Sequence, residues 1–228
     1  MKNENNALTL LAARNYSYRF FQSVFGGEPT KEQIGVWASR ITEDSFLIMP
    51  SDEDSGYSIA LSSVLEILVS AVNEPESYLT KLRQEYTDLF IGPHALPAPP
   101  WESVYLSRER ALFLEDTLTI RNLYRAEGLI PKEYPLVADD HLSLEIAFMS
   151  SLAENALGAY MENCKDIQHH KLQVSKSFLV DHLTIWIPLF TKLLQQQKTT
   201  VFYTQAAILL EKFLELDLAV VDHLLSID

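Results

Sequence analysis

Residues 89–105 read LFIGPHALPAPPWESVY, and this stretch separates two long regions of helical sequence. It contains four prolines, at Pro93, Pro97, Pro99 and Pro100. Each proline lacks a backbone N–H and pushes the preceding residue away from the α region. Gly92 stands directly before the first of them. The sequence therefore predicts a helix that ends at Gly92-Pro93 and an extended loop after it.

Apolar residues recur at helical spacing on both sides of this loop, and no run shows the sustained alternation of a strand. Only seven glycines occur in 228 residues, and the main helix breakers fall between the periodic segments. The expected helices carry their apolar stripes over residues 8–24, 61–72, 79–89, 117–127, 142–156, 178–193 and 202–216, with one more beginning near Thr30.

The predicted fold is all-α, a compact bundle of about eight helices with a long Pro-rich loop between two helical lobes. We expect a single domain over 1–228, made of an N-terminal lobe of about 1–90, a connector of about 91–137 and a C-terminal lobe of about 138–228. Thr30 with Gln33 fits a capping box, and Gly128 is placed for a C-cap. A kink is expected at Pro188.

The charge balance disfavours several kinds of partner. Thirty-one acidic against eighteen basic residues give a formal net charge of −13. Such a surface repels nucleic acid and attracts basic partners, although solubility alone also accounts for it. The polar start of the chain and the lack of ~18 uninterrupted apolar residues predict a cytoplasmic protein without a signal peptide or an integral membrane segment. The lone Cys164 forms neither an internal disulfide nor a zinc-finger pattern.

The proline-rich loop is the first candidate site. Its prolines hold an extended backbone that loses little entropy when a ligand binds. Trp101 and Tyr105 offer the aromatic faces that dominate binding hot spots. Glu102 is a candidate acceptor for an arginine. The alternative is that prolines and aromatic rings seal the seam between the lobes.

Asp139-Asp140-His141 is the second candidate. Asp140 is predicted as the N-cap of the following helix, with Asp139 beside the positive end of the helix dipole. The other interpretation is a recognition site for a cation, with His141 as a hydrogen-bonding neighbour. A third group, His182 and Trp186, lies four residues apart on one helix face and is predicted to be structural packing.

No motif of nucleophilic, P-loop or dinucleotide chemistry is present. An all-α magnesium–diphosphate enzyme using Asp139, Asp140 and Glu145 remains an alternative. Such chemistry needs carboxylates that converge from two helices, and no second acidic motif follows here. A third alternative is an acidic partner-binding scaffold.

These constellations, in this order, resemble the redox-enzyme maturation chaperones of the TorD/DmsD/NarJ-like group. The closest likeness is to the branch that serves dimethyl sulfoxide and trimethylamine N-oxide reductases. The likeness covers most of the chain, and the proline loop is its most specific part. One difference lies at Val137-Ala138-Asp139-Asp140-His141, where the family often shows Glu-Pro-x-Asp-His. The matching segments are Tyr86 to Pro93, Pro97 to Tyr105, Asp140-His141 and His182-Leu183 with Trp186.

The resemblance implies an all-helical protein without enzymatic activity that binds the twin-arginine signal peptide of a molybdenum-cofactor enzyme. It also implies that the chaperone holds the apoenzyme until the cofactor is inserted, before export. No cofactor is predicted, and the sequence does not support nucleotide binding. It leaves open whether the chain is a monomer or a homodimer. The predicted signal-peptide-binding residues are Phe90, Gly92, Pro93, Pro99, Pro100, Trp101, Glu102, Asp140 and His141, with Glu102 and Asp140 as arginine acceptors.

Overall fold

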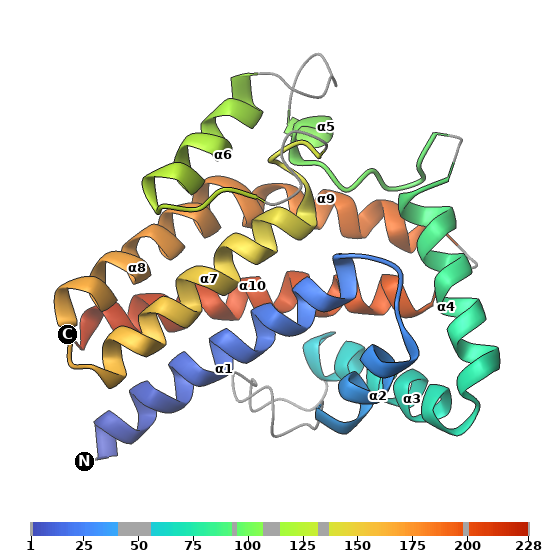
Figure 1. Cartoon of the computed structure of the whole chain (residues 1–228), viewed down its shortest axis with the longest axis horizontal. Helices are drawn as coiled ribbons and strands as arrows, with labels where there is room; N and C mark the ends of the chain where they lie inside the picture. The colour runs from blue at the N-terminus through green and yellow to red at the C-terminus, as the bar shows by residue number, and fades with distance from the viewer. Residues whose placement is uncertain are drawn as a thin grey trace.

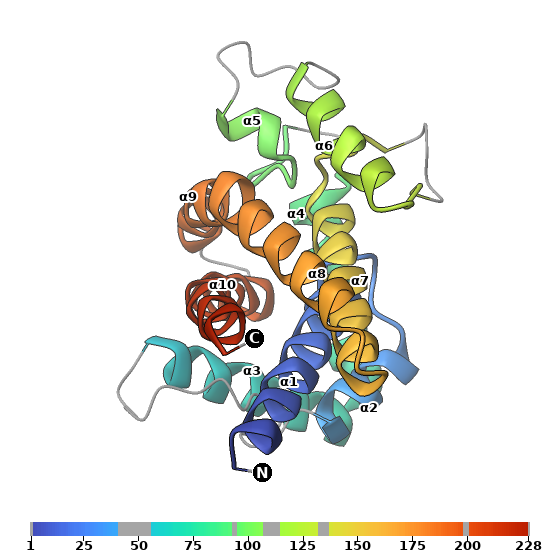
Figure 2. The same ribbon diagram turned by 90° about the vertical axis from the view of Figure 1, so that its left-hand side faces the viewer.

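The computed structural model describes residues 2–40, 56–92, 95–106, 115–131, 137–197 and 201–227 (Figures 1 and 2). Within these ranges every regular element is a helix, apart from a single bridge between Trp101 and His141, so the all-α prediction is confirmed. The helices are α1 (Lys2–Phe25), α2 (Lys31–Arg40), α3 (Gly56–Asn73), α4 (Pro75–Phe90), α5 (Glu102–Leu106), α6 (Glu115–Ala126), α7 (Leu142–Met161), α8 (Lys165–Phe178), α9 (Thr184–Gln195) and α10 (Phe202–Ser226).

Two of these helices go beyond the eight expected from the sequence. α5 is a single short turn at the end of the proline-rich loop. α8 is mostly polar and carries no continuous apolar stripe, because two of its buried positions are the polar residues Gln168 and Ser175. Its burial pattern is nonetheless helical, which the sequence alone did not reveal.

The helix ends follow the local rules that the sequence predicted. The Thr30 backbone N–H donates to Gln33 Oε1 at 2.8 Å, and the Gln33 N–H donates back to Thr30 Oγ1 at 3.2 Å. This reciprocal pair is the capping box at the start of α2. Gly128 has a φ of +74°, in the left-handed region that glycine adopts without a steric penalty, and it ends α6 as expected.

The core joins helices from both ends of the chain. α1 packs along α7, and α3 packs along α10. α10 also contacts α1, α8 and α9, and Figure 1 shows it running through the middle of the molecule. The first 90 residues thus pack directly on helices that follow residue 137. The predicted boundaries of the two lobes stay a prediction.

A fully buried ion pair connects α1 to α10. Arg14 Nε donates to Asp217 Oδ1 at 2.6 Å, and a second guanidinium nitrogen donates to Oδ2 at 3.1 Å. The Tyr18 hydroxyl donates to the same Oδ2 at 2.6 Å. Both charged side chains are 0% exposed. The two paired residues are 203 positions apart in the sequence, and their ion pair holds α1 and α10 together out of contact with water.

A π-helical turn over Leu179–Leu183 joins α8 to α9 without a loop. The Leu179 carbonyl oxygen accepts from both the backbone N–H and the hydroxyl of Thr184, the hydroxyl bond being 2.8 Å long. The sequence placed an irregularity at Pro188. In the structure Pro188 lies inside α9, and the departure from α geometry comes shortly before it.

In the part of the chain that the structure describes, two helical segments are long and apolar enough to cross a membrane, by length and composition only: Gly56–Asn73 and the continuous helix Lys165–Gln195. Core helices of soluble proteins meet the same criteria. Both segments contribute buried side chains to this core, among them Val64 and Leu68 on α3 and Trp186 and Phe190 on α9.

Candidate functional site

The proline-rich loop is fastened to the start of α7 by backbone hydrogen bonds in both directions. The Glu102 N–H donates to the Asp140 carbonyl at 3.1 Å, and the Leu142 N–H donates to the Pro100 carbonyl at 2.9 Å. We call this contact the loop–α7 junction. It brings together five of the predicted site residues, which come from two distant parts of the sequence: Pro100, Trp101, Glu102, Asp140 and His141.

Asp140 has a different role from the N-cap that the sequence predicted. Its side chain is fully buried, and its Oδ2 accepts from the Ser103 N–H at 2.9 Å. The carboxylate therefore caps the first turn of α5 across the junction. The N-cap of α7 is His141, whose Nδ1 accepts from the Ser143 N–H at 3.1 Å. The prediction was wrong because the Asp140 side chain faces the loop instead of its own helix.

His141 is neutral at physiological pH. Burial lowers its pKa to about 4, and the nearby charge of Asp140 offsets this only in part. An unprotonated Nδ1 is also what its role as an N-cap acceptor requires. The edge of the Trp101 ring meets the His141 ring, with centroids 5.2 Å apart.

A buried network of two acids, a histidine and a tryptophan lies beneath the junction. His182 Nδ1 lies 3.0 and 3.1 Å from the two carboxylate oxygens of Glu102. Trp186 Nε1 donates to Glu145 Oε2 at 2.9 Å. Burial first, and then the charges of Glu102 and Asp140, raise the pKa of Glu145 well above its usual range. The raised pKa favours the protonated form of Glu145, which can donate its proton to Glu102.

This raised pKa gives the stability a defined pH dependence. The folded state holds the Glu145 proton more tightly than the unfolded chain, so Glu145 lowers stability as pH rises from ~4.3 toward its folded pKa. Glu145→Gln keeps an acceptor for Trp186 and a donor for Glu102 but cannot ionise. Urea unfolding at pH 5 and pH 8 should show a smaller loss in the free energy of unfolding for Glu145→Gln than for the wild type.

Glu154→Gln is the control for this comparison, because Glu154 is exposed and pairs only with Arg19 at the surface. It should retain the pH dependence of the wild type. Equal pH dependence in Glu145→Gln and the wild type would contradict a neutral Glu145.

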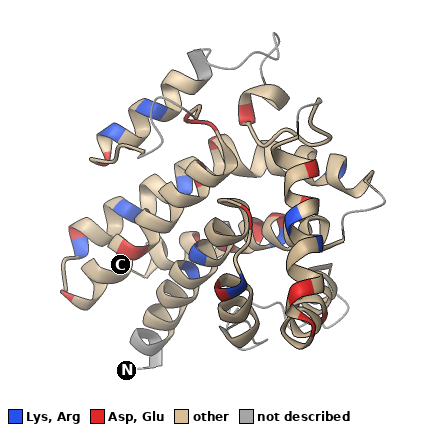
Figure 3. Cartoon of the chain, turned by 45° about the vertical axis from the view of Figure 1, so that its right-hand side comes forward, with Lys and Arg blue, Asp and Glu red and all other residues tan. Residues whose placement is uncertain are grey.

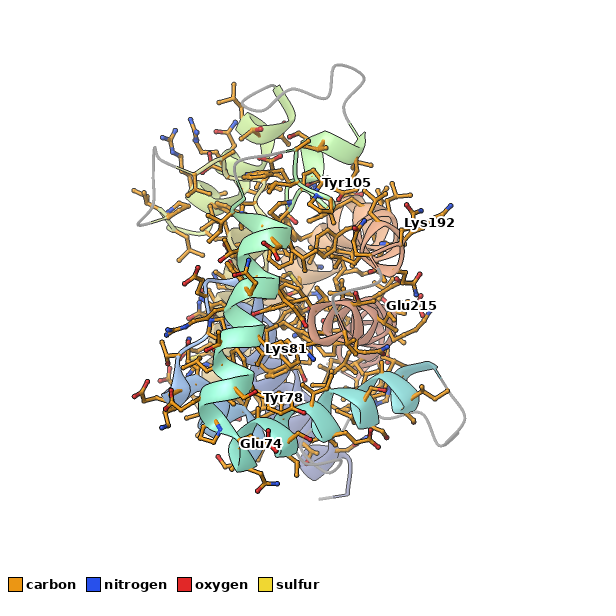
Figure 4. The ribbon with its side chains drawn as sticks, turned by 90° about the vertical axis from the view of Figure 1, so that its right-hand side faces the viewer. Glu74, Tyr78, Lys81, Tyr105, Lys192 and Glu215 are labelled. Atoms are coloured by element: carbon orange, nitrogen blue, oxygen red, sulfur yellow. The ribbon has the colours of Figure 1, made fainter. Side chains whose placement is uncertain are left out.

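The aromatic side chains of the loop are partly open to solvent. Trp101 and Tyr105 are both half-buried, and neither the Trp101 Nε1 nor the Tyr105 hydroxyl has a hydrogen-bond partner among the described residues. The Tyr105 ring stacks on Trp186 with centroids 5.5 Å apart. Figure 4 shows Tyr105 beside α9, on the same face as Lys192. Both of these polar atoms are buried, so what the loop presents to solvent is part of its aromatic surface.

The remaining predicted residues lie at the end of α4 or along the loop. Phe90 is buried in an aromatic cluster, where its ring contacts Phe190 and Tyr203. The Gly92 N–H donates to the Thr87 carbonyl at 2.8 Å and closes the helix. Pro99 is half-buried and Pro100 is buried, whereas Pro93 lies outside the described residues.

Sequence reasoning did not assign His182, Glu145 or Arg121 to this site. His182 and Trp186 were read as packing alone, and Glu145 was considered only for metal binding. Arg121 pairs with Asp139 at 2.6 Å and fastens α6 to the segment before α7. The four-residue spacing of His141 and Glu145 was an available signal, since it places both on one helix face.

These contacts also bear on the magnesium–diphosphate alternative. Asp139 is paired with Arg121, Asp140 caps α5, and buried Glu145 accepts a hydrogen bond from Trp186. Among the described residues no group of three or more His, Cys, Asp or Glu side chains is arranged to hold a metal ion. The three acids are thus engaged in internal contacts.

Fold and site together define a helical protein built around an anchored aromatic loop. The sequence model of the family described as nitrate reductase delta subunit matches residues 54–192, more than half of the chain. The chain belongs to this family, within its TorD/DmsD group of redox-enzyme maturation chaperones.

Individual relatives agree with this assignment. The chain is 36% identical to the Tat proofreading chaperone DmsD of Salmonella typhi over 109 residues, which are 48% of this chain and 47% of the relative. It is 30% identical to the probable Tat proofreading chaperone DmsD of Haemophilus influenzae over 59% of each chain. The aligned part thus spans about half the length of these DmsD relatives. It is 25% identical to the chaperone protein TorD of Aliivibrio salmonicida over 94% of this chain and 96% of the relative. The magnesium–diphosphate alternative is not favoured.

Proposed function

We propose that this chain is a cytoplasmic chaperone, without catalytic activity, that binds the twin-arginine signal peptide of a molybdenum-cofactor redox enzyme. In this proposal it holds the apoenzyme until the cofactor has been inserted and export can follow. The family and the names of its DmsD relatives support this class of ligand. The observation that carries it is the anchored loop, whose half-buried Trp101 exposes part of its side chain to solvent.

The predicted peptide-binding residues divide into two roles within this proposal. Pro99, Trp101 and His141 are half-buried and accessible to a ligand. Glu102 and Asp140 are buried and already accept hydrogen bonds from His182 and Ser103, so they hold the loop in shape. Because buried, hydrogen-bonded residues hold the loop in shape beneath its accessible aromatic face, the loop loses less conformational entropy when a ligand binds.

The overall charge supports a basic ligand. The net charge of −13 attracts the positive end of a signal peptide over long range. Figure 3 shows acidic residues on several helices of the face drawn, so this attraction is broad and not confined to one patch. Specific contacts must then come from the apolar and aromatic surface.

Trp101→Ala should weaken binding of a twin-arginine signal peptide about five- to thirty-fold. This range corresponds to the ~1–2 kcal/mol of a hot-spot side chain. Isothermal titration calorimetry with a synthetic peptide gives the affinity, and circular dichroism of each variant checks that it is folded. Tyr78→Ala is a matched control, because Tyr78 is a half-buried aromatic residue on α4.

Two results would count against the proposal. If the wild-type protein binds the twin-arginine peptide no better than a scrambled peptide, the signal peptide is not the ligand. If the tagged chain recovers no molybdoenzyme precursor from anaerobically grown cells, the proposed partner is wrong. Unchanged affinity in Trp101→Ala would instead place the peptide away from the loop.

A further inference from the structure

A hollow of about 330 Å³ lies between α6 and α8. Its apolar lining residues are Leu123 from α6, Phe148 from α7, and Val174 and Phe178 from α8, and its polar ones include Gln173 and His182. Both phenylalanines belong to the buried core. A volume of this size is at the lower end of those seen for ligand pockets, which suits a few apolar side chains.

The hollow is elongated along α8. His170, Val174 and Ser177 line it, and their spacing of three or four residues places them on one face of α8. Asp181, from the π-helical turn that follows, also lines it. We call this feature the α6–α8 trough. α6 contributes Leu123 to the lining, and most of the other lining residues come from α8.

The two ends of the trough differ in charge. At the His170 end, Glu127 accepts from His170 Nε2 at 3.0 Å and from Lys171 Nζ at 2.5 Å. These contacts bridge α8 to the end of α6 and neutralise the Glu127 carboxylate. At the other end Asp181 is exposed, and it has no hydrogen bond or ion pair with another described residue. One end therefore carries an ion pair, and the other carries a carboxylate that has no partner among the described residues.

Other carboxylates near the trough are already engaged. Glu102 accepts from His182, and Asp139 pairs with Arg121. Asp140 is fully buried. An arginine that approaches this face can reach Asp181 without displacing an internal contact, which is not true of Glu102, Asp139 or Asp140.

We infer that the apolar stretch of the signal peptide lies along the α6–α8 trough, with one of its arginines on Asp181. This inference rests on the proposed function. Signal peptides carry a positive region followed by an apolar one, and the trough offers a carboxylate followed by an apolar wall. The peptide then runs from Asp181 toward His170, with its apolar face against Phe148 and Phe178. A charge-assisted bond from arginine fixes this direction.

Two substitutions test the two ends of this contact. Asp181→Asn removes the charge with little change in shape and should weaken peptide binding about three- to five-fold. Ser177→Phe adds a ring at an exposed position of the trough and should weaken binding about ten-fold, the scale of a lost hot-spot contact. Calorimetry with a synthetic twin-arginine peptide measures both.

Each substitution has a control on the same helix. Asp166→Asn makes the same charge change at an exposed site about 20 Å away along the helix. Ile167→Phe adds a ring at an exposed position outside the trough. Both should bind like the wild type. A peptide whose contacting arginine is replaced by glutamine should be insensitive to Asp181→Asn, because the pair that this substitution breaks is already absent.

The outcomes separate this inference from the proposed function. Wild-type protein that fails to bind the peptide overturns both. The second outcome is that the wild-type protein binds the peptide and that folded Asp181→Asn and Ser177→Phe bind it equally well. This outcome overturns the trough assignment alone and leaves the loop as the binding surface. If Asp166→Asn weakens binding as much as Asp181→Asn does, both substitutions act through the net charge of the protein. That result would also overturn the assignment.

Discussion

Asp217→Ala should lower the free energy of unfolding by about 3–5 kcal/mol, as expected when one partner of a buried ion pair is removed. Arg14 would keep its positive charge in a site that is 0% exposed, and the Tyr18 hydroxyl would lose its acceptor. Since natural domains are stable by only ~5–15 kcal/mol, this single change removes a large part of the total. Urea unfolding followed by circular dichroism at 222 nm measures it.

Two comparisons make this result specific. Glu154→Ala breaks an ion pair with Arg19 whose side chains are 56% and 58% exposed, and it should change stability by less than about 1 kcal/mol. The double variant Arg14→Met/Asp217→Leu removes both charges and should recover most of the loss, since apolar replacement of a whole buried pair is often neutral. A double variant as unstable as Asp217→Ala would show that packing, and not the stranded charge, is responsible.

Trp186→Ala should lower stability by about 3–5 kcal/mol, the range for truncation of a buried aromatic side chain. Trp186 is 0% exposed, and its ring contacts both Tyr105 and Phe190. The substitution also deprives Glu145 of its donor, and this residue is buried beside Glu102. Thermal and urea unfolding provide the measurement.

Trp101→Ala is the matched comparison, because it deletes the same side chain at a half-buried position of the loop. It should cost less stability than Trp186→Ala, and its effect should be seen in peptide binding. If Trp101→Ala unfolds far more easily but binds the peptide like the wild type, the loop is a seam between helices and not a recognition surface.

Local sequence rules were enough for the helix ends and for most of the helices. Thr30, Gln33 and Gly128 act on atoms within a few residues of themselves, so their roles can be read from short stretches. α8 was missed because half of its buried face is polar. The buried Gln168 and Ser175 interrupt the apolar period by which helices are recognised.

The site was predictable only in part, for a related reason. The loop and the Asp140-His141 pair were identified, but their joining depends on contacts between residues far apart in sequence. Glu102 meets His182 across 80 residues, and no local pattern reports such a pairing. For the same reason the sequence suggested that Asp140 caps its own helix, whereas its carboxylate is used by α5.

The π-helical turn has a geometric consequence for the long helix that contains it. An α-helix turns its side chains by about 100° per residue, and the turn inserts one extra residue at Leu179–Leu183. Every side chain from Thr184 onward is therefore out of phase with those of α8. α8 packs on α7 and α10, while α9 directs a differently oriented stripe at α10 and α5. The π-helical turn thus changes the direction of the side chains without interrupting the helix. The trough on α8 and the aromatic contacts of α9 are therefore connected by continuous helical backbone.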